Sequence, residues 1–219
     1  MAPTTRPDLS RTWAVVPIRG LRTAKTRLGG DLAPDERQAL VAEMLRRTLV
    51  ATRDAGSIEG TIVVTLDPAA ARLAKAHGAI GLVERVPGLN EAIVAGRSLA
   101  EARGATAVLV LPADLPRITA AAVTEVVDAS REAVEGAAAL GHRGVVTLVP
   151  DRHGAGTNAI LLSPAGIIEP AFGSASRVTH QAEAVAAGAT YQELGGPLSL
   201  DVDTPDDLLL AGAALVARD

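Results

Sequence analysis

The sequence predicts an α/β fold in which helices cover both faces of a mostly parallel sheet. Short, almost continuously apolar runs alternate along the chain with longer segments whose apolar residues recur at helical spacing. Such runs are typical of strands that are buried on both sides, as in parallel sheets. Ligands of such sheets bind at the carboxyl ends of the strands. The loops after Ile18, Leu111, Val149 and Val202 are therefore the predicted location of a site.

Seven runs are predicted to be strands, because each is short, apolar and bounded by glycine, proline or polar residues. The run TAVLVL at residues 106–111 carries the strongest signal. Crossovers between parallel neighbours are expected to be right-handed. The predicted strands cover residues 12–18, 61–66, 79–83, 106–111, 144–149, 158–162 and 198–202.

The predicted helices lie between these strands and have recognisable ends. Pro34 suits the first turn of one helix, in which Val41, Met44 and Leu45 recur at helical spacing. Thr119 suits the N-cap position of another. The predicted helices cover residues 34–55, 68–77, 90–103 and 119–135, a segment from Ser176 to Gly188, and a last one from Pro205.

We assign residues 1–219 to a single domain, because a chain of this length can bury roughly 70% of its unfolded surface without a metal or disulfide staple. No internal repeat or linker divides it. Residues 1–11 are polar and contain two prolines, so we expect a flexible tail there. The glycine-rich stretch 136–156 is the predicted insertion or flap.

The composition excludes several classes of protein. The chain has no cysteine, which rules out disulfides, thiolate catalysis and cysteine-based metal sites. One Phe, one Tyr and one Trp offer no stacking platform for single-stranded nucleic acid, and a net charge of −4 gives no basic field. No apolar stretch reaches 18 residues and no secretory signal opens the chain. We expect a cytoplasmic protein with neither nucleic acid nor membrane as a partner.

The first candidate site is the loop PIRGLRTAKTRLGG at residues 17–30, directly after the first predicted strand. It places Arg19, Arg22, Lys25 and Arg27 within nine residues. Arginine forks and a lysine ammonium suit phosphate, and glycine lets the backbone turn toward an anion. The spacing matches neither the P-loop nor the dinucleotide fingerprint. A solvated basic loop is the alternative to phosphate binding.

The second candidate site is acidic. Asp114 stands between two prolines after the strongest strand, where it is either a turn residue or a metal ligand. Asp201 and Asp203 lie on the same side if their segment is extended, and two carboxylates on one side favour a cation such as Mg²⁺. Asp206 and Asp207 fall in the first turn of the last helix, where we expect them to act as caps.

A third group combines GAGTN at residues 154–158 with FGSASRVTH at residues 172–180. Both segments offer hydroxyl groups and backbone N–H groups. Ser176 is alternatively the N-cap of the following helix, a position that also suits phosphate. His180 lies about one turn inside that helix and is interpreted as a packed or surface histidine. The sequence contains no convincing Ser-His-Asp arrangement and no histidine pair at zinc spacing.

Six motifs are spread along the chain: VPIRGLRTAKTRL, LNEAI, LPADLP, GTNA, FGSAS…H and DVDTPDDL. Together they resemble the guanylyltransferase family of coenzyme F-420 biosynthesis, a branch of the molybdopterin-nucleotidyltransferase-like superfamily. LPADLP is common to the wider superfamily, whereas the early AKTRL with GTN and FG…S…H is more specific. The resemblance spans residues 13–210 and implies a three-layer nucleotidyltransferase variant of the Rossmann fold.

The resemblance also implies an activity and the residues that carry it. The family uses Mg²⁺ to transfer GMP from GTP to the phosphate of phosphoenolpyruvate or 2-phospho-L-lactate, and it releases pyrophosphate. The implied nucleotide-binding residues are Pro17, Arg19, Gly20, Lys25, Arg27 and Asn90, of which Lys25 and Arg27 also act in catalysis. The implied metal ligand and catalytic residue is Asp114, helped by Asp201 or Asp203. The implied acceptor-binding residues are Thr157, Gly173 and Ser176.

Several alternatives stay open at the level of sequence. A related nucleotidyltransferase that uses CTP, or a molybdopterin or sugar-phosphate acceptor, would share the basic loop and the aspartate. A non-catalytic nucleotide-binding protein would keep the basic loop and could dispense with the carboxylates. The choice between the two acceptors and the oligomeric state are undetermined. The family further implies that the product is handed to the next transferase of the F-420 pathway.

Overall fold

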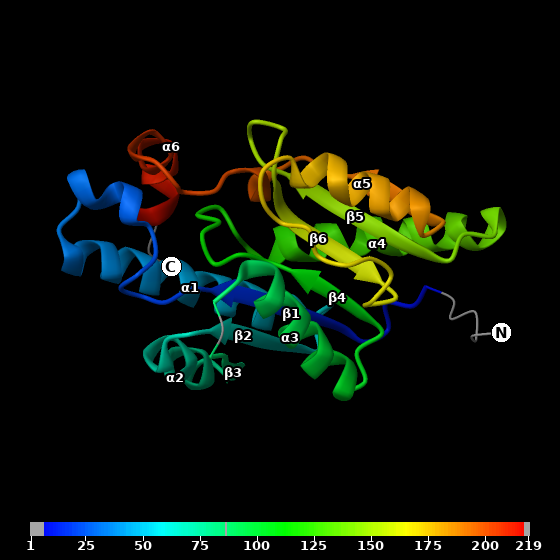
Figure 1. Cartoon of the computed structure of the whole chain (residues 1–219), viewed down its shortest axis with the longest axis horizontal. Helices are drawn as coiled ribbons and strands as arrows, with labels where there is room; N and C mark the ends of the chain where they lie inside the picture. Colours follow the sequence, from blue (N-terminus) through cyan, green and yellow to red (C-terminus); the bar gives the residue numbers. More distant parts are fainter. Residues whose placement is uncertain (1–6, 86, 217–219) are drawn as a thin grey trace.

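The computed structural model describes residues 7–85 and 87–216 as one seven-stranded sheet with helices on both faces (Figure 1). The predicted fold class is confirmed. The strand order is β3-β2-β1-β4-β6-β5-β7. The strands are β1 (Thr12–Ile18), β2 (Gly60–Thr65), β3 (Ile80–Val83), β4 (Ala107–Val110), β5 (Gly144–Pro150), β6 (Thr157–Ser163) and β7 (Ala189–Glu193).

The sheet is mostly parallel, and β6 is the strand that breaks the pattern. β1 pairs in parallel with both β2 and β4, β2 with β3, and β5 with β7. β6 runs antiparallel to its neighbours β4 and β5. The amino end of β6 therefore lies at the same edge as the carboxyl ends of the other strands. Residues 157–158, which open β6, reach the predicted ligand edge for this reason.

Two groups of helices sandwich the sheet. The helices are α1 (Pro34–Asp54), α2 (Pro68–Ala76), α3 (Leu89–Ala102), α4 (Ala120–Leu140), α5 (Ser176–Ala186) and α6 (Pro205–Val216), with short 3-10 turns η1 (Thr26–Gly30) and η2 (Pro197–Ser199). Buried residues of α1, α2 and α4 share one core with Val16 and Leu109 of the sheet. Ile93 of α3 and Ala184 of α5 belong to the core on the opposite face, with Val15 and Val108. Neighbouring strand residues thus alternate between two cores, as the pleat requires.

The strand order places a crevice at the middle of the sheet. From β1 the chain builds outward through β2 to β3, and from β4 it builds the other way, so the order reverses between β1 and β4. Loops that leave two such strands diverge to opposite sides and open a space for a ligand. The basic loop after β1 and the Asp114 loop after β4 flank this point.

The prediction of a strand at residues 198–202 is wrong. The strand β7 was not predicted. Residues 197–199 form η2, and the Val202 N–H donates to the Asp114 carbonyl at 3.1 Å outside any strand pairing. β7 has the sequence ATYQE and is only partly buried, because it lies at the edge of the sheet. A polar edge strand lacks the apolar run by which a buried strand is predicted.

The predicted flap at residues 136–156 is also wrong for most of its length. α4 continues to Leu140 and ends at Gly141, whose φ of 72° suits glycine. β5 is buried inside the sheet, and only residues 151–156 form a turn. No helix of the described ranges is both long and apolar enough to cross a bilayer.

The packed part of the chain begins before the end of the expected flexible tail at residues 1–11. The Asp8 N–H donates to the Ser163 hydroxyl at 2.9 Å, and that hydroxyl donates to the Asp8 carbonyl. Leu9 is buried in the core that α1, α2 and α4 share with the sheet. These contacts fasten the start of the chain to the end of β6. Residues 1–6 of the expected tail lie outside the described residues.

Candidate active site

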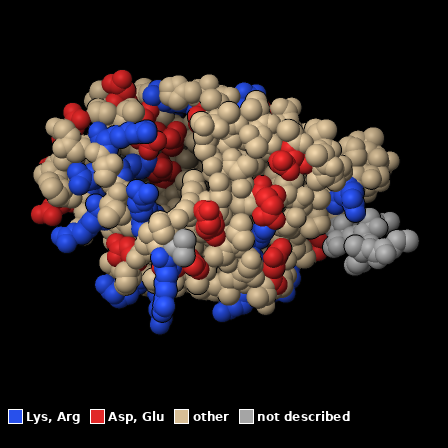
Figure 2. Space-filling view, viewed as in Figure 1, with Lys and Arg blue, Asp and Glu red and all other residues tan. Residues whose placement is uncertain are grey.

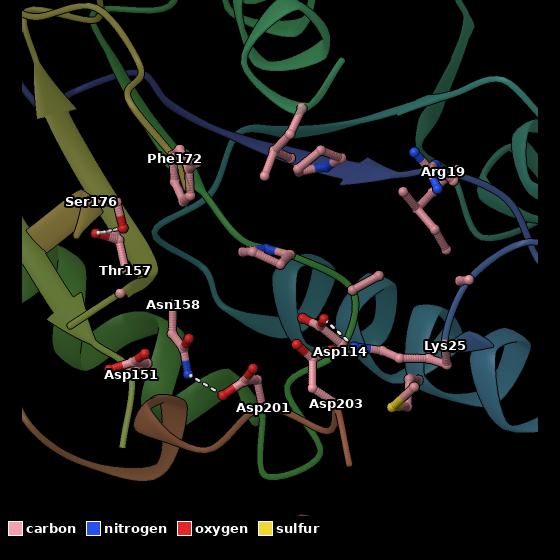
Figure 3. A pocket seen from close by; sticks show the side chains of 18 of the residues that line it. Arg19, Lys25, Asp114, Asp151, Thr157, Asn158, Phe172, Ser176, Asp201 and Asp203 are labelled. Carbon is pink, nitrogen blue, oxygen red and sulfur yellow. Dashed lines mark hydrogen bonds and ion pairs between the residues drawn. The ribbon is translucent and has the colours of Figure 1, made fainter. Parts of the chain in front are cut away.

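A crevice of about 390 Å³ lies at the switch point, between the loops after β1 and β4 and the amino end of β6. Nine of the sequence-predicted site residues line it, and Figure 3 shows most of them facing one space. Figure 2 shows basic and acidic side chains meeting at a hollow in this part of the molecule. The nine residues are Pro17, Arg19, Lys25, Asp114, Thr157, Gly173, Ser176, Asp201 and Asp203.

One wall of the crevice is acidic and is organised around Lys25. The Lys25 ammonium donates to Asp114 Oδ2 at 2.5 Å and to Asp203 Oδ1 at 2.7 Å. Burial works against the charged form of Lys25, but the charges and hydrogen bonds of the two aspartates outweigh it, so the pKa of Lys25 is raised. The two carboxylates share one nitrogen and are therefore close enough to share one cation. The structure thus brings Asp114 and Asp203 close together, as the sequence predicts.

Lys25 reaches this position through an unusual backbone conformation. It precedes η1 with a φ of 57°, in the left-handed region that non-glycine residues seldom adopt. Its side chain is only 8% exposed. The ion pairs with Asp114 and Asp203 offset the cost of this conformation, which turns the ammonium from the surface loop into the crevice.

Asp201 completes the acidic wall but does not contact Lys25. Its Oδ1 accepts a hydrogen bond from Asn158 Nδ2 at 3.4 Å, as Figure 3 shows. Burial, together with the negative charges of Asp114 and Asp203, raises the pKa of Asp201. Three carboxylates thus face one buried ammonium, and the excess of negative charge favours binding of a further cation.

Asp207 holds the segment that carries Asp201 and Asp203. Its Oδ2 accepts hydrogen bonds from the backbone N–H groups of Asp203 and Thr204 and from the Thr204 hydroxyl. Arg152 pairs with the other oxygen at 2.5 Å. Asp207 is therefore a structural cap, as predicted, whereas Asp206 is exposed in the first turn of α6.

The carboxylates are suited to Mg²⁺ only as part of a shared set of ligands. Mg²⁺ in nucleotide sites takes one or two carboxylates and completes its shell with phosphate oxygens and water. Within the described part of the chain, no three His, Cys, Asp or Glu side chains gather closely enough to hold an ion by themselves. Asp114 with Asp203 or Asp201 fits the first requirement, and a bound triphosphate would supply the rest.

The basic loop supplies cations with different surroundings. Arg19 is exposed at the crevice and forms no ion pair or hydrogen bond with any residue that the structure describes. Arg27 is 77% exposed and lies outside the lining, with its Nη1 3.7 Å from Asp203 Oδ2. Gly20 also lies outside the lining, where a Cβ would come 3.0 Å from the Asp67 Cβ, so glycine there permits close packing of the loop. Among the described cations of this loop, Arg19 is thus the one without a partner, because Arg22, Lys25 and Arg27 each contact another side chain.

The opposite wall is neutral and rich in hydroxyl groups. Ser176 Oγ donates to Thr157 Oγ1 at 3.1 Å, and His180 Nδ1 lies 3.1 Å from the same oxygen. The predicted N-cap role of Ser176 is wrong, because Ala175 is the N-cap and Ser176 is the first residue of α5. Its hydroxyl is turned to Thr157 instead.

His180 is fully buried behind this wall and its hydrogen bonds define its tautomer. The Ala171 N–H donates to Nε2 at 3.0 Å, so the ring hydrogen is on Nδ1 and donates to Thr157. Burial lowers the pKa of His180 to about 4, so the ring is neutral near pH 7. Thr157 Oγ1 therefore accepts two hydrogen bonds, which leaves its own hydrogen for a ligand oxygen in the crevice.

Asn90 is placed differently from the nucleotide-binding role that the resemblance implies. Its Nδ2 donates to the Phe172 carbonyl at 3.1 Å and its Oδ1 accepts from the Phe172 N–H at 2.8 Å. Both ends of the amide are used, and Asn90 is not part of the lining. It fastens the segment that carries Gly173, whose φ of 147° requires glycine. Asn90 therefore supports the neutral wall.

The sequence analysis did not single out Asp151, and it named Asn158 and Phe172 only as parts of their motifs; all three line the crevice. Asp151 follows β5, and its Oδ1 accepts from the Ala155 N–H at 2.9 Å, which shapes the turn before β6. Asn158 donates to the Leu198 carbonyl at 3.1 Å as well as to Asp201. Phe172 packs edge-on against His180 with ring centroids 5.1 Å apart. The position of Asp151 after an apolar run was a usable signal; the pairing of Asn158 depends on contacts distant in sequence.

The chain is similar to known proteins over nearly its whole length. A family model described as "Guanylyl transferase CofC like" matches residues 12–213. A phosphoenolpyruvate guanylyltransferase of Sphaerobacter thermophilus is 45% identical over 94% of this chain and 95% of the relative. One of Conexibacter woesei is 37% identical over 90% of this chain and 85% of the relative.

Solved structures agree on the fold. A nucleotide-diphospho-sugar transferase structure from Desulfovibrio desulfuricans aligns with a TM-score of 0.65 at 15% identity, covering 91% of this chain and 85% of the other. A 4-diphosphocytidyl-2C-methyl-D-erythritol synthase aligns at 0.62 and 15% identity, covering 94% and 99%. A Mycobacterium tuberculosis protein solved in complex with manganese aligns at 0.51 and 20% identity, covering 92% and 97%.

Proposed function

The chain belongs to the CofC-like guanylyl transferase family, and from this premise we propose that it transfers the guanylyl group of GTP to the phosphate of phosphoenolpyruvate and releases pyrophosphate. It is an enzyme of the nucleotidyltransferase type. The relatives named above support phosphoenolpyruvate over 2-phospho-L-lactate as the acceptor. The proposed pathway is coenzyme F-420 biosynthesis, with the product passed to the next transferase.

The observation that carries the proposal is the opposition of two different walls across one crevice. Lys25, Asp114 and Asp203 form a charged group on one side, and Thr157 with Ser176 forms a neutral, hydrogen-bonding group on the other. A nucleotidyl transfer needs this division, because a triphosphate with its cation must meet a second phosphate. The free Arg19 at the mouth supplies positive charge for phosphate oxygens.

The chemistry requires no covalent intermediate and no general base. The acceptor phosphate carries about −1.5 to −2 charge near neutral pH, so its oxygen is already a nucleophile. This oxygen attacks the α-phosphorus of GTP in line, the bond to the β-phosphate oxygen breaks, and pyrophosphate leaves with that electron pair. The difficulty is the repulsion of two anions, which the enzyme reduces by positioning and by positive charge.

Each wall has a defined part in this step. Lys25 and Arg27 neutralise charge that develops on the leaving pyrophosphate, and Arg19 orients the triphosphate. The Thr157 hydroxyl hydrogen, held ready by Ser176 and His180, donates to an acceptor oxygen. Gly173 presents backbone without a side chain beside the acceptor.

We propose Mg²⁺ as the metal, held by Asp114 together with Asp203 or Asp201. When bound, the ion would neutralise negative charge on phosphate oxygens. The raised pKa of Asp201 and the surplus of carboxylates support a cation at this wall. The manganese complex among the structural neighbours is a further support for a divalent ion in this fold.

The direct test is to incubate purified protein with GTP and Mg²⁺ and to add phosphoenolpyruvate or 2-phospho-L-lactate separately. We expect pyrophosphate release and a guanylated product, identified by mass, with phosphoenolpyruvate. Reactions with CTP, and with molybdopterin or a sugar phosphate as the acceptor, test the related nucleotidyltransferases. Nucleotide binding without pyrophosphate release from any pair would indicate a non-catalytic protein and contradict the proposal.

A further inference from the structure

A second cavity, of about 290 Å³, opens directly beside the crevice. The two spaces share Pro17, Ile18, Arg19 and Leu89 as walls, so a ligand in one can continue into the other. The second cavity lies at the carboxyl ends of β2 and β3, on the side of β1 away from the neutral wall. A molecule whose phosphates lie at Arg19 would place its other end here.

The walls of this cavity are mostly apolar and lack a net positive charge. Val64, Leu66 and Ala92 line it together with the shared residues. Leu66 is 37% and Leu89 46% exposed, which is unusual for leucines and leaves apolar surface open to a ligand. Apolar walls with few polar groups are typical of pockets for flat organic rings.

Glu84 is the acidic residue in this cavity, and its carboxylate is uncommitted. Its backbone N–H donates to the Thr65 carbonyl at 2.9 Å, which fixes the residue at the end of β3. Its side chain is half-buried and makes no hydrogen bond or ion pair with the residues that the structure describes. Thr65 Oγ1, by contrast, accepts the Asp67 N–H at 3.0 Å. A half-buried carboxylate without a partner favours a ligand that brings hydrogen-bond donors.

We propose that this cavity holds the guanine base of GTP and that Glu84 selects it by accepting hydrogen bonds from the N1–H and the 2-amino group. The inference rests on the proposed function, which supplies the nucleotide. Guanine presents these two donors side by side, a spacing that one carboxylate accepts with both oxygens. Adenine and cytosine each present a ring-nitrogen acceptor on the same edge, which a carboxylate repels. Glu84 is thereby a specificity-determining residue.

The acceptor substrate is a poor occupant of this cavity for an electrostatic reason. Phosphoenolpyruvate carries a phosphate and a carboxylate, and both would meet the negative charge of Glu84. The neutral wall offers the Thr157 hydroxyl hydrogen as a donor to an acceptor oxygen. The mostly apolar cavity therefore suits the flat base, and the crevice with the Thr157 hydroxyl suits the acceptor.

Inosine triphosphate is the sharpest probe, because it differs from GTP only by lacking the 2-amino group. Dissociation constants of GTP and ITP, measured by calorimetry without acceptor, and kcat/KM with phosphoenolpyruvate are compared in the parent enzyme and in Glu84→Ala. We expect the parent to favour GTP by about 10- to 100-fold, the worth of one good bidentate contact. In Glu84→Ala we expect the two nucleotides to become nearly equal.

Two further variants make the test specific. Glu91→Ala removes a neighbouring exposed carboxylate that does not line the cavity, and it should keep the preference of the parent. Glu84→Gln retains the size of the side chain and one acceptor oxygen, and it should show an intermediate preference. If circular dichroism shows that Glu84→Ala does not fold, Glu84→Gln replaces it as the test variant.

The possible results separate this inference from the proposed function. If the parent does not distinguish GTP from ITP, or if both Glu84 variants keep its preference, the inference is overturned and guanylyl transfer can still stand. If no acceptor yields pyrophosphate but Glu84→Ala removes the preference in binding, the inference stands and the proposed function fails.

Discussion

The two walls of the crevice are built by opposite means. The acidic wall uses charged side chains on loops after β1 and β4 and before α6, joined by ion pairs across large sequence separations. The neutral wall uses short side chains on β6 and α5, which are buried and joined by hydrogen bonds. Asp203 is 47% exposed, whereas Thr157 and Ser176 are 8% and 2% exposed.

The two walls therefore have different tasks: one supplies charge, and the other supplies a fixed hydrogen-bonding geometry. The interaction energy of partly exposed charges depends on the charges of the ligand and the cation that bind beside them. Buried neutral groups cannot give up a partner without a cost of about 1–3 kcal/mol, so they hold one geometry. The experiments below test whether the acidic wall governs the rate and the neutral wall governs acceptor binding.

The largest effect is expected from Asp114→Asn. The substitution removes the charge that pairs with Lys25 and favours the cation, so turnover should fall by at least about 10²-fold while the fold is kept. Steady-state kinetics and circular dichroism check this. Asp206→Asn, an exposed neighbour of the same wall, is the matched control and should be unchanged. An unaltered rate in Asp114→Asn would remove that residue from the mechanism.

A pH titration of stability should expose the neutral wall through His180. The folded protein keeps this ring neutral down to about pH 4, whereas the unfolded chain binds the proton near pH 6.5. The unfolded state thus holds more protons in this window, so acidification favours unfolding. We expect the contribution of His180 to the free energy of unfolding to fall by on the order of 2–3 kcal/mol between pH 6.5 and 4, measured by urea unfolding of the parent and of a His180 variant.

The variant His180→Phe isolates this contribution. It should be less stable than the parent at pH 7, because the Ala171 N–H loses its acceptor and Thr157 loses a donor. The difference should shrink as the pH falls toward 4. His153→Phe, at an exposed position, should follow the parent. A difference between His180→Phe and the parent that stays constant with pH would contradict the neutral, buried state of the ring.

Thr157→Val should separate the two substrates. Valine keeps the shape but removes the hydroxyl hydrogen offered to the acceptor, so the KM for phosphoenolpyruvate should rise by about tenfold. The KM for GTP should change little. Thr179→Val, at an exposed position of α5, serves as the control. Equal increases in both KM values would place Thr157 in the nucleotide site.

The smallest effect is expected from Asn90→Ala. Its amide fastens Phe172, so its loss should loosen the Gly173 segment and raise the KM for phosphoenolpyruvate by about three- to tenfold. The KM for GTP should stay within about twofold, because the amide faces the acceptor side. Kinetics with each substrate varied in turn decide the matter. A selective increase in the KM for GTP would restore the nucleotide role that the family resemblance implies.

Most of the acidic wall was predictable, because its residues follow directly from sheet topology. Asp114 comes after a fully apolar strand, and Lys25 lies in the loop after another, so the rule for parallel sheets brings both to one edge. The fold class follows from the same alternation of runs. Charged residues that directly follow an apolar run form a local pattern, and a local pattern can be recognised in one sequence without knowledge of tertiary contacts.

The neutral wall and the segment at residues 198–202 were less predictable, because their structures depend on contacts between residues distant in sequence. Nothing near His180 shows that Ala171 and Thr157 will bond to its two nitrogens. The Val202 N–H finds the Asp114 carbonyl rather than a strand partner, so an apolar run at residues 198–202 was wrongly predicted as a strand. The edge strand β7 was not predicted, because it is polar and only partly buried and therefore lacks an apolar run.

The bond from Val202 to Asp114 has a consequence for how the enzyme matures. Translation supplies Lys25 and Asp114 early, whereas Asp201 and Asp203, with the Asp207 that holds them, are the last residues of the acidic wall to leave the ribosome. The same late segment also completes one of the two cores, because Leu198, Leu200 and Val202 are buried in it. Competence for the proposed binding of the nucleotide with its cation therefore arrives only when this last part of the chain is in place.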